Sequence, residues 1–134
     1  MLTQKLEQYW PNVKVNTTDP LYESFWQHEW EKHGLCTAMD QNTYLEQALK
    51  SELVLGTPTS IAINTGSSVG LTEIEAGYAK RTAISCAGKV HLQAIYSCWE
   101  KDAFDQPVAQ IDCPENVMQK MNTCIGPVIQ IQSF

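Results

Sequence analysis

The stretch FWQHEWEKHGLC, residues 25 to 36, concentrates side chains that can take part in chemistry. It holds two histidines, three charged side chains and a cysteine. In an α-helix each residue turns by about 100°, so positions 28, 29, 32 and 33 fall at about 0°, 100°, 40° and 140°. One face of a helix is therefore expected to carry four polar residues, namely His28, Glu29, Lys32 and His33.

This combination of residue types suits a phosphate group that gains negative charge during a reaction. Lys32 and a protonated His28 can hold non-bridging oxygens, and His33 can transfer protons. Glu29 can orient or stabilise an imidazolium. Metal-free RNA cleavage needs this chemistry, because the ribose 2′-hydroxyl attacks its own phosphodiester and forms a 2′,3′-cyclic phosphate. DNA lacks the 2′-hydroxyl and would not be cut.

Two other interpretations of the helix face are possible. The first is a solvated face with an ordinary Glu-to-His pair four residues apart, but it explains neither the clustered tryptophans nor the adjacent cations. The second is a zinc protease, whose motif is H-E-x-x-H. Here the spacing is H-E-x-x-x-H, which separates the histidines by about 140° on a helix. This spacing disfavours a zinc site, and the RNA cleavage described above needs no metal and no other cofactor.

The bulk composition limits the class of protein. The 134 residues fit one domain, with 43% hydrophobic and 18% charged residues, as in globular proteins. No apolar run is long enough to span a membrane, and the first residues do not form a secretory signal. A net charge of −6 disfavours non-specific binding to nucleic acid, so a polyanion has to be held locally. Protonation of three histidines below pH 6 would bring the charge to about −3.

Five cysteines and a glycosylation sequon at Asn16 favour an oxidising compartment, secreted or endolysosomal, although such a sequon can also occur by chance. The periodicity predicts helices over residues 2–10, 21–33 and 41–53, with starts at Asp19-Pro20 and Asp40 and a stop at Gly34. A helical turn is expected over 72–78, and strands over 82–86, 90–99, 108–112 and 128–132. Helices come first and strands last, which indicates an α+β fold with helices packed on a central antiparallel sheet.

The stretch at 25 to 36 resembles the second active-site signature of the ribonuclease T2 family, a family of acid ribonucleases of secretory and vacuolar compartments. The similarity extends upstream to LEQYWP at 6–11 and downstream to LQAIYSC at 92–98 and DCP at 112–114. The downstream segment looks nearest to fungal or oomycete members. By this resemblance His33 is a proton-transfer histidine, Glu29 and Lys32 stabilise the pentacovalent phosphate, and His28 binds phosphate.

The resemblance also implies that Phe25 stacks on a base of single-stranded RNA, while a core aromatic is the alternative. The family has an earlier signature similar to H-G-L-W-P, which carries the second proton-transfer histidine, and residues 1 to 134 contain no such stretch. His91 lies in a predicted strand and is expected to be structural. We therefore expect the chain to be the C-terminal portion of one ribonuclease T2-like domain, weak or inactive without an N-terminal segment. A catalytically inactive RNA-binding or secreted effector relative is the alternative.

The cysteine count gives a second indication of a missing segment. Five cysteines leave at least one unpaired, and two bridges among them can be drawn in 15 ways, five choices of the unpaired residue times three pairings. The family resemblance implies Cys86 with Cys124 and Cys98 with Cys113. Cys36 is then left without a partner in residues 1 to 134.

Overall fold

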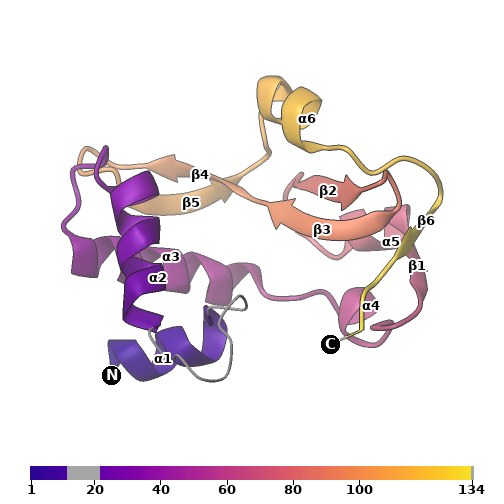
Figure 1. Ribbon diagram of the computed structural model, residues 1–134. Coiled ribbons are helices and arrows are strands. Elements are labelled where there is room, and N and C mark those ends of the chain that lie inside the picture. The colour runs from indigo at the N-terminus through magenta and orange to yellow at the C-terminus, as the bar shows by residue number, and fades with distance from the viewer. Residues whose placement is uncertain (12–21, 134) are drawn as a thin grey trace. The chain divides into compact units, whose positions relative to one another are not determined.

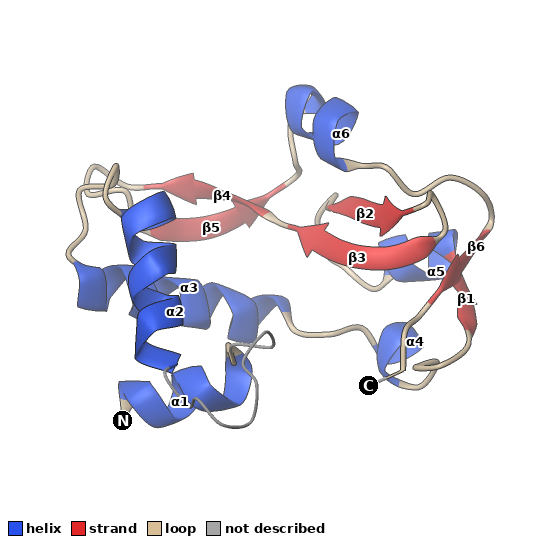
Figure 2. Cartoon of the chain, viewed as in Figure 1, coloured by secondary structure: helices blue, strands red, loops and turns tan. Residues whose placement is uncertain are grey.

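The computed structural model describes residues 1–11 and 22–133 and has the expected α+β composition (Figures 1 and 2). The sequon at Asn16 and the helix start at Asp19-Pro20 lie outside the described residues. The chain divides into two compact units. The first, the helical unit, comprises Met1–Val54 and Lys101–Pro107; the second, the sheet unit, comprises Leu55–Glu100 and the chain from Val108. The expectation that both form part of one domain stays a prediction.

The helical unit is built on three helices that bury a small aromatic core. These helices are α1 (Leu2–Tyr9), α2 (Tyr22–Glu29), which continues into the π-helical turn η1 (Trp30–Gly34), and α3 (Gln41–Leu55). The buried residues at their meeting point are Leu6, Trp26 and Leu45. The indole Nε1–H of Trp26 donates to the carbonyl of Trp10 at 3.0 Å and so joins α2 to the end of α1. The predicted opening helix and the helix over 41–53 are both confirmed.

The start of α3 carries the predicted capping residue. The carboxylate of Asp40 accepts a hydrogen bond from the backbone N–H of Thr43 at 2.8 Å. That bond lowers the pKa of Asp40 below its ordinary value of 3.8. A lowered pKa means that the stabilisation is present above the ordinary value and is lost as the pH falls through the lowered one. The cap therefore persists in a mildly acidic compartment.

The sheet unit contains most of the strands. Its first elements are α4 (Thr59–Ala62), β1 (Ser68–Gly70), α5 (Leu71–Ala76), β2 (Ala83–Ala87) and β3 (His91–Tyr96). A hairpin of β4 (Cys98–Lys101) and β5 (Pro107–Ile111) follows, and the last elements are α6 (Glu115–Met121) and β6 (Val128–Gln130). The main sheet has the order β1-β6-β3-β2, while β4 and β5 form a separate two-stranded sheet. The core of the unit includes Ile74, Ile84 and Ile129, all fully buried.

Two expectations about this unit need correction, and one of its helices, α6, was not predicted. The main sheet is mixed rather than purely antiparallel, because β6 reaches it through α6 instead of a hairpin and pairs parallel to β3 at His91 and Gln130. The single strand expected over 90–99 is two strands, which separate at Ser97 and belong to different sheets. Helix α6 was not predicted, although Pro114 and Glu115 are residues that favour a helix start.

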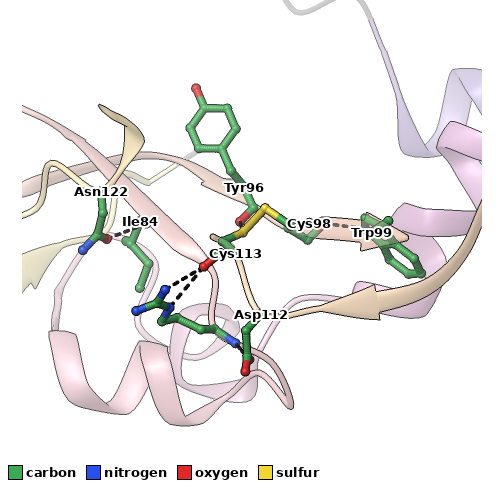
Figure 3. The surroundings of a disulfide bond; sticks show 9 residues. Ile84, Tyr96, Cys98, Trp99, Asp112, Cys113 and Asn122 are labelled. Atoms are coloured by element: carbon green, nitrogen blue, oxygen red, sulfur yellow. Dashed lines mark hydrogen bonds between the residues drawn. A yellow bond between two sulfur atoms is a disulfide. The ribbon is translucent and has the colours of Figure 1, made fainter. Parts of the chain in front are cut away.

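Two disulfide bonds link segments of the sheet unit. They are Cys86–Cys124 and Cys98–Cys113, the pairs that the family resemblance implies, and Cys36 is an exposed free thiol. Figure 3 shows that Cys98–Cys113 lies where β3 ends and β4 begins. The carbonyl of Cys113 also accepts two hydrogen bonds from the guanidinium of Arg81, at 3.2 and 2.8 Å. Cys113 is therefore held by hydrogen bonds as well as by its disulfide bond.

Candidate active site

The segment 25–36 spans the end of α2 and the π-helical turn η1. The backbone N–H of Leu35 donates to the carbonyl of Trp30 at 3.1 Å, the five-residue spacing of a π-helix. The sequence predicts a regular α-helix through His33 that stops at Gly34; the stop is confirmed but the last turn is wider. The α-helical angles computed for Lys32 and His33 therefore do not apply. Single π-helical turns occur frequently at functional sites.

The wide turn accommodates the indole ring of Trp30. Gly34 is buried, and a Cβ atom placed there would overlap Cε3 of Trp30. The same indole contacts the ring of Tyr44 on α3, with centroids 5.6 Å apart and planes tilted by 56°. The absence of a side chain at Gly34 thus allows Trp30 to pack across the turn that carries Lys32 and His33.

We expect Gly34→Ala to lower the free energy of unfolding by about 1 to 3 kcal/mol, because the new methyl group overpacks against the Trp30 ring. Urea unfolding followed by tryptophan fluorescence measures the loss. The double variant Trp30→Leu with Gly34→Ala is the control, since a smaller side chain at position 30 makes room for the methyl group. The contact is unimportant if Gly34→Ala is as stable as the parent protein.

The structure pairs two of the four candidate residues. Nε2 of His33 lies 3.8 Å from Oε2 of Glu29, within ion-pair distance when the imidazole is protonated. The Glu29 side chain is 23% exposed and that of His33 is 53% exposed, so the carboxylate is the more shielded partner. His28 and Lys32 are exposed on the same segment. In the described part of the chain, no other pair among these four comes within ion-pair distance.

Tyr44 is a neighbour of the site that the sequence did not reveal. Tyr44 is half-buried, and its pKa is raised first by burial and then by the negative charge of Glu29. A neutral phenol therefore sits near the carboxylate of Glu29. No periodicity could identify it, because Tyr44 lies on α3 and approaches the site only when α3 packs against the π-helical turn.

Phe25 packs as a core aromatic would. Its ring meets that of Trp10 edge to face, at 6.1 Å and 86°, and it lies against the buried cluster of the helical unit. It is half-buried. These are the contacts expected if Phe25 is a core aromatic, the alternative considered from the sequence. Stacking of Phe25 on a base stays a prediction. His91 lies in the sheet unit, exposed at the start of β3.

The segment that leaves the π-helical turn is fixed by polar contacts. The hydroxyl of Thr37 donates to the carbonyl of Gly34 at 2.7 Å, and Sγ of Cys36 lies 3.7 Å from the carbonyl of His33. The backbone N–H of Ala38 donates to Oδ2 of Asp105 at 2.8 Å, which ties the segment to the β4–β5 hairpin. The exit from the turn therefore has a defined conformation.

Two features are absent from the described residues. No three side chains of His, Cys, Asp or Glu within 1–11 and 22–133 gather in a way that could hold a metal ion. Over the same residues, no helix combines the length and the apolar character that crossing a bilayer requires.

Comparisons with known proteins place the chain in a family. The family model described as the ribonuclease T2 family matches residues 1–113. Intracellular ribonuclease LX of Solanum lycopersicum is 32% identical over 146 aligned positions, which cover 99% of this chain and 58% of that protein. The chain therefore belongs to the ribonuclease T2 family, as the resemblance at residues 25 to 36 indicates.

Other relatives show how much of the family's length is present. Ribonuclease 1 of Arabidopsis thaliana is 28% identical over 127 positions, covering 84% of this chain and 53% of that protein. Ribonuclease M of Aspergillus phoenicis is 36% identical over 53 positions, covering 39% of this chain. The chain thus spans a little over half the length of the two plant relatives. No solved structure matches it significantly. The expected likeness to fungal or oomycete members stays a prediction.

Proposed function

We propose that this chain supplies part of the active site of an endoribonuclease that cleaves single-stranded RNA through a 2′,3′-cyclic phosphate. The observation that carries the proposal is the Glu29–His33 pair, held on a π-helical turn within the family's signature. A carboxylate beside an imidazole can orient the ring and offset the positive charge that the ring gains when it takes up a proton. His28 and Lys32 lie on the same segment and are exposed to solvent, so both can reach the phosphate oxygens of a bound RNA strand.

In the proposed reaction, the 2′-hydroxyl of the ribose loses its proton and attacks the adjacent phosphorus, and the 5′-oxygen of the next nucleotide leaves with a proton. His33 is proposed to carry one of these two protons, with Glu29 stabilising the imidazolium. Lys32 and His28 would offset the charge of the pentacovalent phosphate. No step requires a metal ion. Acidic conditions reduce the net negative charge of −6 and so the repulsion of an RNA strand.

The other proton needs a second group, which we propose to come from a segment of the same protein outside residues 1 to 134. The absence of an H-G-L-W-P-like stretch from the sequence supports this, as does coverage of only 58% of a relative. A secreted or vacuolar location is proposed because two disulfide bonds need an oxidising compartment to form.

The experiment that tests the function is incubation of the chain with single-stranded RNA at pH about 5 in EDTA. We expect slow cleavage with 2′,3′-cyclic phosphate ends, detected by mass spectrometry, and no cleavage of DNA of the same sequence. Addition of a peptide that carries the family's first signature should increase the rate. Cleavage that stops in EDTA, or that also occurs on DNA, contradicts the proposed chemistry.

The second candidate function is binding of RNA without turnover, in a non-catalytic or secreted effector relative. It is favoured by the unpaired thiol of Cys36 and by the absence from residues 1 to 134 of the H-G-L-W-P-like stretch that would carry the second proton-transfer histidine. The same incubation distinguishes the two, because a binder shifts RNA in a gel but leaves it intact even with the added peptide.

A further inference from the structure

The tip of the β4–β5 hairpin is a rigid loop that belongs to the helical unit. The carboxylate of Asp102 accepts hydrogen bonds from the backbone N–H groups of Phe104 and Gln106, at 2.8 and 3.0 Å. The backbone N–H of Asp102 in turn donates to the carbonyl of Gln106 at 3.0 Å. Asp105 adopts a left-handed backbone conformation with φ of 62°, which aspartate tolerates better than most residues. The polar groups of the loop thus fix its backbone.

This rigid loop displays an aromatic ring in water. The side chain of Phe104 is 67% exposed, although the local hydrogen bonds would hold the loop equally well with a polar residue there. An ordered, exposed phenylalanine loses hydrophobic stabilisation that a buried one would gain. It does, however, offer a flat π-face that needs little further ordering to bind a planar ligand.

The loop is tied to the exit of the π-helical turn. Oδ2 of Asp105 accepts a hydrogen bond from the backbone N–H of Ala38, and Oδ1 accepts one from the ammonium of Lys101 at 2.6 Å. Ala38 follows His33 by only five residues. Figure 1 shows the hairpin tip next to the chain that leaves α2 and enters α3. The position of Phe104 is thereby coupled to that of the candidate phosphate-binding segment.

The hydrogen bond from Ala38 to Asp105 is maintained under acidic conditions. Hydrogen bonding from Lys101 is the main cause that lowers the pKa of Asp105, and the N–H of Ala38 adds to it. The carboxylate therefore stays ionised as the pH falls toward 5, and the link between the loops is lost only below the ordinary aspartate range. The side chain of Lys101 is 69% exposed, and its ammonium can also attract a phosphate.

We propose that Phe104 stacks on a nucleobase of single-stranded RNA whose backbone phosphate is held at residues 28–33. This inference rests on the proposed function and adds to it a base-contacting residue on the β4–β5 hairpin. Exposed aromatic rings beside cations are the usual means by which proteins hold single strands, since every base has a π-face. In a chain of net charge −6, such a contact supplements the few cations available for the backbone.

The test is the affinity of the full chain for a fluorescent 2′-O-methyl hexanucleotide at pH about 5 in EDTA, measured by anisotropy. The 2′-O-methyl groups block attack on phosphorus, so binding is measured without cleavage. We expect Phe104→Ala to weaken binding about tenfold, and Phe104→Leu nearly as much, because leucine has bulk but no π-face. Phe104→Trp should bind at least as tightly as the parent.

Val54→Ala is the matched control, since Val54 is 64% exposed and lies about 20 Å along α3 from the first residue of that helix. It should change the affinity less than twofold. A series of hexanucleotides with one abasic position each identifies the stacked base. Removing that base should weaken the parent about tenfold but the Phe104→Ala protein less than twofold, because the contact is already lost.

The outcomes separate this inference from the proposed function. If the parent binds RNA and Phe104→Ala or Phe104→Leu binds equally well, stacking at Phe104 is wrong while the proposed function stands. If abasic positions weaken both proteins equally, stacking is also wrong. If the parent does not bind the hexanucleotide at all, the proposed function fails and the role of Phe104 fails with it.

Discussion

Replacing His33 with alanine should lower the rate of RNA cleavage by about 100- to 10,000-fold, the usual contribution of a positioned acid or base. The reason is that His33 is the histidine paired with Glu29, and no other group within ion-pair distance of that carboxylate in the described residues can transfer a proton near pH 5. The rate is best measured with a fluorogenic single-stranded RNA, both for the chain alone and with the peptide that carries the first signature.

Affinity for RNA should change much less than the rate, because phosphate contacts from His28 and Lys32 do not depend on His33. His91→Ala is the control: this histidine is also exposed, but it lies in the sheet unit, and its replacement should leave the rate unchanged. Glu29→Gln should reduce the rate by a smaller factor, since the imidazolium loses its charged partner but the proton carrier remains. Cleavage that survives His33→Ala contradicts the assignment of the proton-transfer residue.

Replacing both Cys86 and Cys124 with alanine should lower the free energy of unfolding by about 4 kcal/mol. The bond closes a loop of 38 residues, and the longer the loop, the more the cross-link restricts the unfolded chain. Both sulfur atoms also lie within the core of the sheet unit, which contains Ile84 and Ile129. Urea unfolding followed by far-UV circular dichroism measures the change.

Two other cysteine variants are informative controls. The Cys98–Cys113 bond closes a loop of only 15 residues, so its removal should cost about 3 kcal/mol, with the hydrogen bonds from Arg81 still holding the Cys113 carbonyl. Cys36→Ala should leave the unfolding free energy unchanged, because its thiol is free and exposed. Equal stability of the parent and the Cys86, Cys124 double variant contradicts the expected role of the longer bridge.

The sequence predicts those parts of the structure that depend on local residue types. The first helix, the capped start of α3 and the strands around β2 and β3 follow from periodicity and from single residues such as Asp40. The candidate site on 25–36 follows from residue spacing, and the family resemblance implies the cysteine pairs. In each case the signal lies within a few residues of the feature, or in a motif specific to one family.

The remaining features depend on contacts between distant residues. In the π-helical turn Trp30 packs over Gly34 and against Tyr44, and a helical period cannot show these contacts. The hydrogen bond from Ala38 to Asp105 joins residues that are 67 positions apart. The separation of β3 from β4 at Ser97 leaves the apolar alternation along the chain unbroken, so periodicity gives no sign of it. Whether β6 runs parallel or antiparallel in the sheet depends on which strand it pairs with, and local sequence patterns do not indicate that strand.

The outer edge of β2 is covered by the segment 122–124 rather than by another strand. The backbone N–H groups of Ile84 and Cys86 donate to the side chains of Asn122 and Thr123, and the carbonyl of Ile84 accepts from the N–H groups of Thr123 and Cys124. An uncovered strand edge is a template for pairing with other molecules and so for aggregation. Because Cys124 belongs to the covering segment, the Cys86–Cys124 bond also keeps this edge closed to intermolecular pairing.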